Sequence, residues 1–256
     1  MSSEPARPWR RGEPSTRLGP GPVAIPGDYQ YRALTQGPAA QRFWHQRKLE
    51  LVRTLARPRA GMRALDVGCG SGVVAHFLAE QGAVVDAVDT NEEALRFARA
   101  QFAMADLRFH LGPANEMAFA DESFDLIVCM ELIEHLPARQ VVDLLGLVRR
   151  LLRPEGVLLV TTPNYQSLWP AIEWLMDALR LSPPMRGRQH VTRFTAERLE
   201  RVLRAAGLAV RRVGRFCGLA PFVSALSRPL AERLDAAEWQ AGQPLGNLLY
   251  ALAGNT

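Results

Sequence analysis

The chain has 256 residues, of which 48% are hydrophobic and 22% charged, an ordinary composition for a globular protein that can bury a large core in one domain. It contains no uncharged apolar run of the length of a membrane-spanning helix and no apolar N-terminal stretch typical of a secretory signal, so we expect a cytoplasmic protein. The net charge is +5, but no basic motif with interleaved aromatic residues is present, and we expect no nucleic-acid partner.

Composition divides the chain into three parts. Residues 1–28 are rich in Pro, Gly, Arg and Ser and predict a disordered tail. Residues 38–216 carry regular apolar patterning and form the predicted main domain, with a substrate-side insertion at 165–194. Residues 217–256 are apolar and predict a C-terminal helical segment.

Within the main domain, short apolar runs alternate with helical patterns. A helix is expected from about Pro38 to Arg57. Strands are then predicted at 63–67, 84–89, 107–111, 124–130, 156–162 and 208–216, and helices at 73–81, 91–103, 141–152, 168–181 and 195–206. This alternation is typical of an α/β fold with a doubly wound, mostly parallel sheet.

The first strand leads into a glycine-rich turn. Asp66 precedes Gly68 and Gly70 in this turn, where the backbone can approach a ligand closely. A carboxylate at this place would repel a phosphate and would suit a cationic ligand. The second strand ends in Asp89, and an acid at that place accepts hydrogen bonds from two ribose hydroxyls. Together these features predict a ligand that carries ribose but no pyrophosphate.

Four motifs in order extend this interpretation: the turn at 65–72, the acid Asp89, the strand at 123–129 and the turn at 152–158. They resemble the corresponding motifs of class I S-adenosylmethionine-dependent methyltransferases. The resemblance covers about residues 40 to 165 and implies a Rossmann-like seven-stranded sheet. It also implies S-adenosylmethionine as cofactor, bound by Asp66, Gly68, Gly70 and Asp89, with Met130 nearby.

The match to the family is less direct for the residues expected to bind the cofactor carboxylate and the adenine. Arg47 matches roughly the place of an arginine that contacts the cofactor carboxylate, and slippage of the match would give this role to Lys48 or Arg53. Many family members carry an acid near the adenine after the third strand. Here the segment is 112–115, so we expect backbone groups and Asn115 to recognise the adenine.

A narrower resemblance follows the fourth strand. The run 129–137 contains Glu131, Glu134 and His135 and resembles the ubiquinone-biosynthesis O-methyltransferases and the methyltransferase type 11 group. In the former, a divalent metal binds two carboxylates and an imidazole at these places. Residues i, i+3 and i+4 share one helical face, so these three could hold Mg²⁺ and lower the pKa of an acceptor hydroxyl. Alternatively His135 acts as a general base, or simply lines the pocket.

Two later segments also match the narrower family. Residues 161–164 follow the fifth strand, and residues 189–194 resemble a His-x-x-x-Phe segment in which His190 would touch the substrate or act as a base. The apolar helix expected at 168–181 suits a pocket lid, a membrane surface or an ordinary core position.

The sequence therefore predicts O-methylation of a hydroxyl on a hydrophobic acceptor, such as a polyprenyl catechol or quinone. Such an acceptor implies peripheral contact with the inner membrane surface. Two alternatives stay open: methylation of a sugar, polyketide or lipid-linked intermediate without a metal, and a non-catalytic binding protein that keeps the fold. The acceptor and the oligomeric state do not follow from the sequence.

Overall fold

The computed structural model describes residues 26–178 and 189–255. Nearly all of the predicted disordered tail, and the end of the helix predicted at 168–181, lie outside these ranges. The helices are α1 (Tyr29–Thr35), α2 (Ala39–Leu51), η1 (Val52–Ala56), α3 (Val73–Glu80), α4 (Glu92–Gln101), η2 (Ala114–Glu116), η3 (Ile133–His135), α5 (Ala138–Leu151), α6 (Trp169–Ala178), α7 (Ala196–Ala205), α8 (Ala220–Val223) and α9 (Arg228–Gln240). The strands are β1 (Arg63–Val67), β2 (Val84–Asp89), β3 (Leu107–Leu111), β4 (Phe124–Met130), β5 (Leu152–Pro163), β6 (Ala209–Phe216) and β7 (Leu248–Gly254).

The strands form one seven-stranded sheet in the order β3-β2-β1-β4-β5-β7-β6. The pairs from β3 to β5 are parallel, and β7 runs antiparallel to both β5 and β6. The predicted doubly wound, mostly parallel Rossmann-like sheet is confirmed. Strand order reverses between β1 and β4, and in such sheets ligands bind at the carboxyl ends of the strands beside this switch point.

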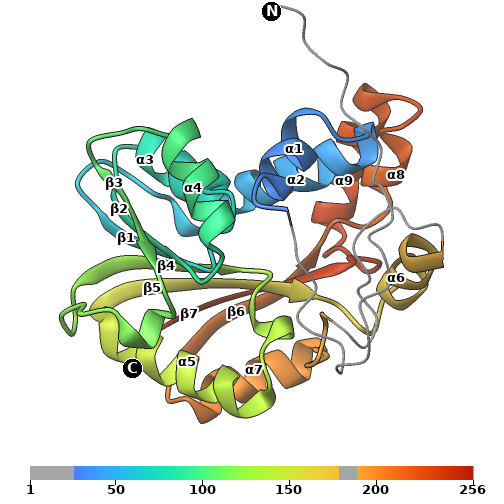
Figure 1. Cartoon of the computed structure of the whole chain (residues 1–256). Coiled ribbons are helices and arrows are strands. Elements are labelled where there is room, and N and C mark those ends of the chain that lie inside the picture. The colour runs from blue at the N-terminus through green and yellow to red at the C-terminus, as the bar shows by residue number, and fades with distance from the viewer. Residues whose placement is uncertain (1–25, 179–188, 256) are drawn as a thin grey trace, which may run out of the picture.

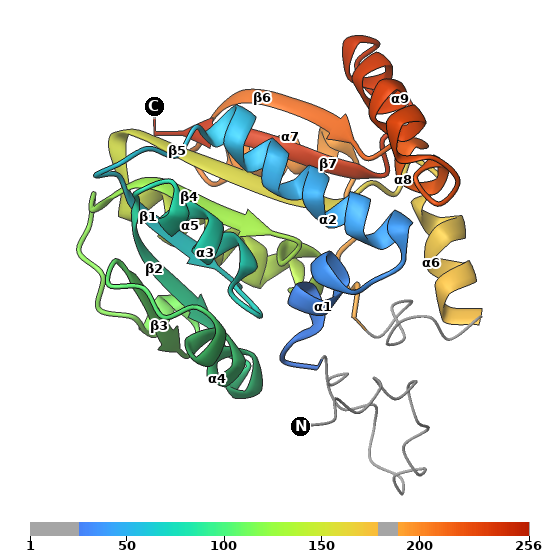
Figure 2. The same cartoon turned by 90° about the horizontal axis from the view of Figure 1, so that it is seen from above.

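Helices cover both faces of the sheet (Figure 1). Helices α1 to α4 and α9 lie on one face, and α5 and α7 lie on the other. Seen from above, α2 runs over the sheet, with α8 and α9 beside its N-terminal half and α6 next to them (Figure 2). Alternate residues of each parallel strand therefore enter two separate cores. Ala64 and Val128 belong to one, and Leu65 and Cys129 to the other, as expected of strands buried on both sides.

Two elements differ from the sequence-based prediction. The C-terminal segment contains the predicted helices, but residues 248–254 form β7 instead of helix. This strand is inserted between β5 and β6, so it belongs to the same sheet as the main domain. Its apolar run, buried on both faces, has no alternation that separates strand from helix. Helix α1 lies upstream of the first predicted helix and was not expected. In the described part of the chain, no helix is long and apolar enough to cross a membrane.

Candidate active site

The turn between β1 and α3 adopts a conformation that requires glycine. Gly68, Gly70 and Gly72 have φ angles of 76°, 50° and 80°, in the left-handed region that other residues rarely adopt. A Cβ atom at Gly70 would lie 2.3 Å from Nε2 of Gln30. The side chain of Gln30 in α1 therefore packs directly on the backbone of Gly70, where any side chain would collide with it.

Asp89 at the end of β2 is tied to this turn. Its Oδ2 accepts a hydrogen bond from the backbone N–H of Gly70 at 2.7 Å, and its Oδ1 accepts one from the N–H of Asn91 at 2.8 Å. Asn91 also caps α4, because its side chain accepts a hydrogen bond from the backbone N–H of Ala94. The two backbone contacts fix the Asp89 carboxylate at the carboxyl edge of the sheet, beside the glycine turn.

Asp66 lies beneath the turn and is fully buried. Burial, with a further contribution from the negative charge of Asp89, raises the pKa of Asp66 to about 7. Its Oδ2 atom has no hydrogen-bond partner among the described residues. A buried carboxylate without a compensating charge is costly, so a cation bound at the turn would be favoured electrostatically. These features fit a sulfonium nucleoside that also carries an ammonium group.

Helix α1 closes the turn from the N-terminal side. Gln30 Oε1 accepts a hydrogen bond from the backbone N–H of Ser71 at 3.0 Å, and Ser71 Oγ accepts one from the N–H of Tyr31 at 3.0 Å. The sequence signal that could have indicated α1 is weak, because a seven-residue helix has little periodicity to detect.

The remaining predicted cofactor residues occupy two different places. Met130 ends β4 and is partly buried, with its sulfur 3.8 Å from Thr161 Oγ1. Asn115 lies in η2, just after β3, and its side chain is exposed. The loop after β3 is held against β2 by a hydrogen bond from the backbone N–H of Gly112 to the carbonyl oxygen of Asp89. An adenine-binding role for Asn115 stays a prediction.

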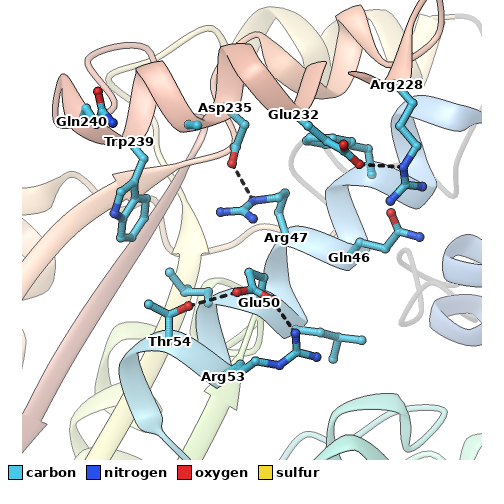
Figure 3. Close-up of a pocket in the computed structure, with 14 residues that line it drawn as sticks. Gln46, Arg47, Glu50, Arg53, Thr54, Arg228, Glu232, Asp235, Trp239 and Gln240 are labelled. Carbon is cyan, nitrogen blue, oxygen red and sulfur yellow. Dashed lines mark hydrogen bonds and ion pairs between the residues drawn. The ribbon is translucent and has the colours of Figure 1, made fainter. Parts of the chain in front are cut away.

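Arg47, which was predicted to contact the cofactor carboxylate, contacts helix α9 in the structure. Its Nε forms an ion pair with Asp235 Oδ2 of α9 at 2.9 Å. Both line a groove of about 590 Å³ between α2 and α9 (Figure 3). The residues that line this groove do not include the glycine turn at 68–72. One residue further along, Lys48 forms an ion pair with Glu131 at the carboxyl end of β4. The role of Lys48 at the cofactor carboxylate, which was the alternative considered from the sequence, stays a prediction.

Glu131, Glu134 and His135 do not converge as predicted. The chain after β4 forms only the short turn η3, and Glu131 has a φ of 53°, so no helical face exists to bring the three together. Thr161 Oγ1 donates to Glu131 Oε1 at 2.9 Å, and Thr162 Oγ1 donates to Glu134 Oε2 at 3.1 Å. Successive strand residues point to opposite faces of a sheet. The two carboxyl groups are therefore held on opposite sides of β5.

This arrangement does not support magnesium binding by Glu131, Glu134 and His135 together. The donor atoms that do gather, all within 4.8 Å of one another, belong to Glu134, His135 and His190. Magnesium prefers an octahedral shell of oxygen atoms, and two imidazoles with one buried carboxyl do not fit it. Burial and the charge of Glu131 raise the pKa of Glu134 to about 8, which favours a neutral carboxylic acid near neutral pH.

His135 and His190 are brought together from distant parts of the sequence. Their ring centroids are 5.1 Å apart. His135 Nδ1 lies 3.0 Å from the carbonyl oxygen of Gln189, and burial lowers the pKa of His135. His190 is buried, and its ring lies 6.1 Å from that of Trp169. Trp169 in turn lies 5.7 Å from Trp44 of α2. Imidazole and indole rings thus gather beside the carboxyl ends of β4 and β5.

Sequence reasoning missed one member of this group. Glu173 of α6 is 2% exposed, and its Oε1 lies 2.8 Å from Nδ1 of His190. The only available signal was an acidic residue within an apolar helical run, which is more often a solvent-facing residue.

The fold and the glycine turn are those of the class I S-adenosylmethionine-dependent methyltransferases. A family model described as a methyltransferase domain matches residues 40–213. A methyltransferase from Archaeoglobus fulgidus, described as dependent on S-adenosylmethionine, superposes with a TM-score of 0.62 at 18% identity, over 88% of this chain and 98% of its own. This structural likeness shows the shared fold.

Curated relatives agree on the reaction class. Ubiquinone biosynthesis O-methyltransferases of Haemophilus ducreyi and Thiobacillus denitrificans are 32% and 34% identical over 124 and 167 residues. The matches cover 46% and 63% of this chain, and 52% and 70% of those proteins, so the first match spans about half of the relative's length. The chain belongs to the methyltransferase-domain family, whose members use S-adenosylmethionine as methyl donor.

Proposed function

We propose that this enzyme methylates a hydroxyl group on a hydrophobic acceptor. The observation that carries the proposal is the pair of imidazoles, His135 and His190, whose ring centroids lie 5.1 Å apart beside the carboxyl end of β4. A hydroxyl is a poor nucleophile while it keeps its proton, and histidine is the side chain best suited to accept that proton near neutral pH. The names of the matched relatives, which are O-methyltransferases, support the same reaction.

Residues at the strand ends would bind the cofactor. Asp89 would accept hydrogen bonds from the ribose hydroxyls, and Asp66 would favour the positive charges held above the glycine turn. Lys48, already near Met130 through its ion pair with Glu131, would bind the cofactor carboxylate in place of Arg47. Asn115 and the backbone after β3 would face the adenine. When bound, S-adenosylmethionine supplies an electrophilic methyl group on a sulfonium.

The surroundings of the imidazoles favour an apolar acceptor. The ring of Trp169 lies next to that of His190, and Trp44 lies next to Trp169. Helix α6 also exposes Trp174 and Leu175, which are 56% and 48% accessible. An exposed tryptophan beside a leucine suits a hydrophobic ligand or the surface of a membrane. A polyprenyl catechol or quinone-like compound has this combination of an apolar body and a reactive hydroxyl.

The test is a mass-spectrometric search of cell extracts for a product heavier by one methyl group in place of hydrogen. Its formation should require the enzyme and S-adenosylmethionine, and His190→Gln should lower it at least tenfold. A chelator should leave the rate unchanged, because Glu131 is engaged by Lys48 and Thr161. Methyl transfer to nitrogen or carbon alone, or equal activity of His190→Gln, would contradict the proposal.

A further inference from the structure

Helix α6 buries an acidic side chain and exposes apolar ones, the reverse of the usual arrangement. It buries Glu173, which is 2% exposed, and exposes Trp174 and Leu175. An acidic side chain in an apolar interior is costly unless hydrogen bonds or charges compensate for it. A buried Glu173 therefore needs hydrogen-bond or ion-pair partners inside the protein, and two residues provide them.

The two partners are His190 and Tyr165. Nδ1 of His190 lies 2.8 Å from Glu173 Oε1, and the Tyr165 hydroxyl donates to the same oxygen at 3.0 Å. The Tyr165 oxygen is also 3.1 Å from His190 Nδ1. The single hydroxyl proton goes to the carboxylate. Burial, together with the negative charge of Glu173, raises the pKa of Tyr165. His190 Nδ1 is then left to donate its own proton to Glu173.

We propose that Glu173 is the positioning carboxylate of a Glu–His pair in which His190 is the general base for the acceptor hydroxyl. The proposal rests on the O-methylation proposed above and deepens it. Glu173 accepts the Nδ1–H proton, holds the tautomer whose lone pair is on Nε2, and stabilises the imidazolium that forms. Tyr165 orients the carboxylate from its other side. Because Glu173 is on α6, the seating of this helix completes the base.

The proton and electron balance is simple. The acceptor oxygen forms a bond to the methyl carbon, and the bond from sulfur to that carbon breaks with its electron pair passing to sulfur. The hydroxyl proton passes to Nε2 of His190. The products are the methyl ether, the neutral thioether of the cofactor and an imidazolium that pairs with Glu173. The proton leaves to solvent when the products depart.

His135 is the weaker candidate for the base. Its Nδ1 contacts a neutral acceptor, the carbonyl of Gln189 at 3.0 Å, whereas His190 contacts a carboxylate. A carboxylate stabilises an imidazolium much more than a carbonyl does. Among the described residues, the other ionisable groups around His190 are His135 and Glu134, whose donor atoms lie within 4.8 Å of its own, and Tyr165.

The first test reads the tautomer directly and needs no acceptor. Nitrogen-15 NMR of protein labelled at its five histidines, with His190→Gln used to assign the signal, should show His190 protonated on Nδ1 and unprotonated on Nε2 at mildly alkaline pH. A proton on Nε2 with a bare Nδ1 would overturn the proposal. This reading stands even if hydroxyl methylation proves to be wrong.

The second test is kinetic, with the extract fraction that supports methyl transfer. Glu173→Gln should lower kcat roughly 100-fold, part of the range for general-base catalysis, and should leave the Kd for S-adenosylmethionine within twofold. Glu173→Asp should recover part of the rate, and Tyr165→Phe, the matched control that keeps the carboxylate, should lose less than tenfold. A kcat within twofold of wild type in Glu173→Gln, with the variant folded by circular dichroism, would overturn the proposal.

Discussion

The backbone N–H of Gly70 donates a hydrogen bond of 2.7 Å to Oδ2 of Asp89, which lies on the neighbouring strand. This contact joins the glycine turn to the acid that we propose binds the ribose, and it exists without a ligand. It means that the turn and the acid act as one preorganised unit, and that removing the carboxylate affects both.

Replacement of Asp89 tests this unit. Asp89→Ala should raise the Kd for S-adenosylmethionine by about 100-fold or more, equivalent to roughly 3 kcal/mol, because it removes acceptors for the ribose and for Gly70. Isothermal titration calorimetry measures the change. Glu92→Ala, an exposed neighbour at the start of α4, is the matched control and should bind as wild type does. Undiminished binding by Asp89→Ala would show that the cofactor site is elsewhere.

The raised pKa of Asp66 predicts pH-dependent cofactor binding. With its pKa at about 7, this carboxyl is largely protonated in mild acid, and a cationic ligand must bind at the expense of that proton. The affinity should fall by up to about tenfold for each pH unit below 7. Asp66→Asn should bind more weakly at pH 7 and should lose this dependence. Calorimetry from pH 5 to 7 measures the Kd of both wild type and Asp66→Asn. The same pH dependence in the two proteins would contradict the prediction.

The same carboxyl predicts a stability effect of the opposite sign. Its folded pKa lies above the unfolded value of 3.8, so the folded state binds the proton more tightly, and stability from this group is lost as pH rises through about 7. Without cofactor, Asp66→Asn should therefore be more stable than wild type at pH 8, by on the order of 2 kcal/mol. Thermal melts at acidic and alkaline pH measure this, and the gain should shrink in acid.

Arg47 and Lys48 form a natural pair of variants. Arg47→Ala should leave cofactor affinity within twofold but lower stability by about 2 kcal/mol, because the buried Asp235 loses its partner. Lys48→Ala should weaken cofactor binding by about tenfold, because a lone salt bridge to the cofactor carboxylate is lost. Calorimetry and melting curves on both variants separate the two roles. The reverse pattern would restore Arg47 as the cofactor ligand.

The position of β7 predicts that the C-terminus is essential for folding. Deletion of residues 248–256 should abolish cooperative unfolding, because β5 and β6 lose the strand between them and expose unpaired edges. The milder Ala251→Pro should destabilise the protein by about 3 kcal/mol or more through a lost ladder hydrogen bond and the ring of proline. Circular dichroism follows both. A truncated chain that melts like wild type would contradict the strand's role.

Local patterns in the sequence were enough to predict most of the fold. The strands at 63–67, 84–89, 107–111 and 124–130 have the predicted bounds, because runs of apolar residues bounded by turns are typical of covered parallel strands. The glycine turn and Asp89 follow from the same logic, since both lie at strand ends whose place in a parallel sheet is fixed by topology. Strand β7 escaped prediction because its apolar run, buried on both faces, has no alternation that separates strand from helix.

The amino-acid sequence by itself determined the cofactor half of this enzyme, where function depends on strand ends and on glycine conformation. Only the tertiary structure decided the acceptor half. Adjacent hydroxyls on Thr161 and Thr162 separate Glu131 from Glu134, which a spacing of three residues had suggested were partners. Glu173 and His190 meet across 17 residues of sequence. Such contacts depend on how helices and loops pack against the sheet, and residue spacing does not encode that packing.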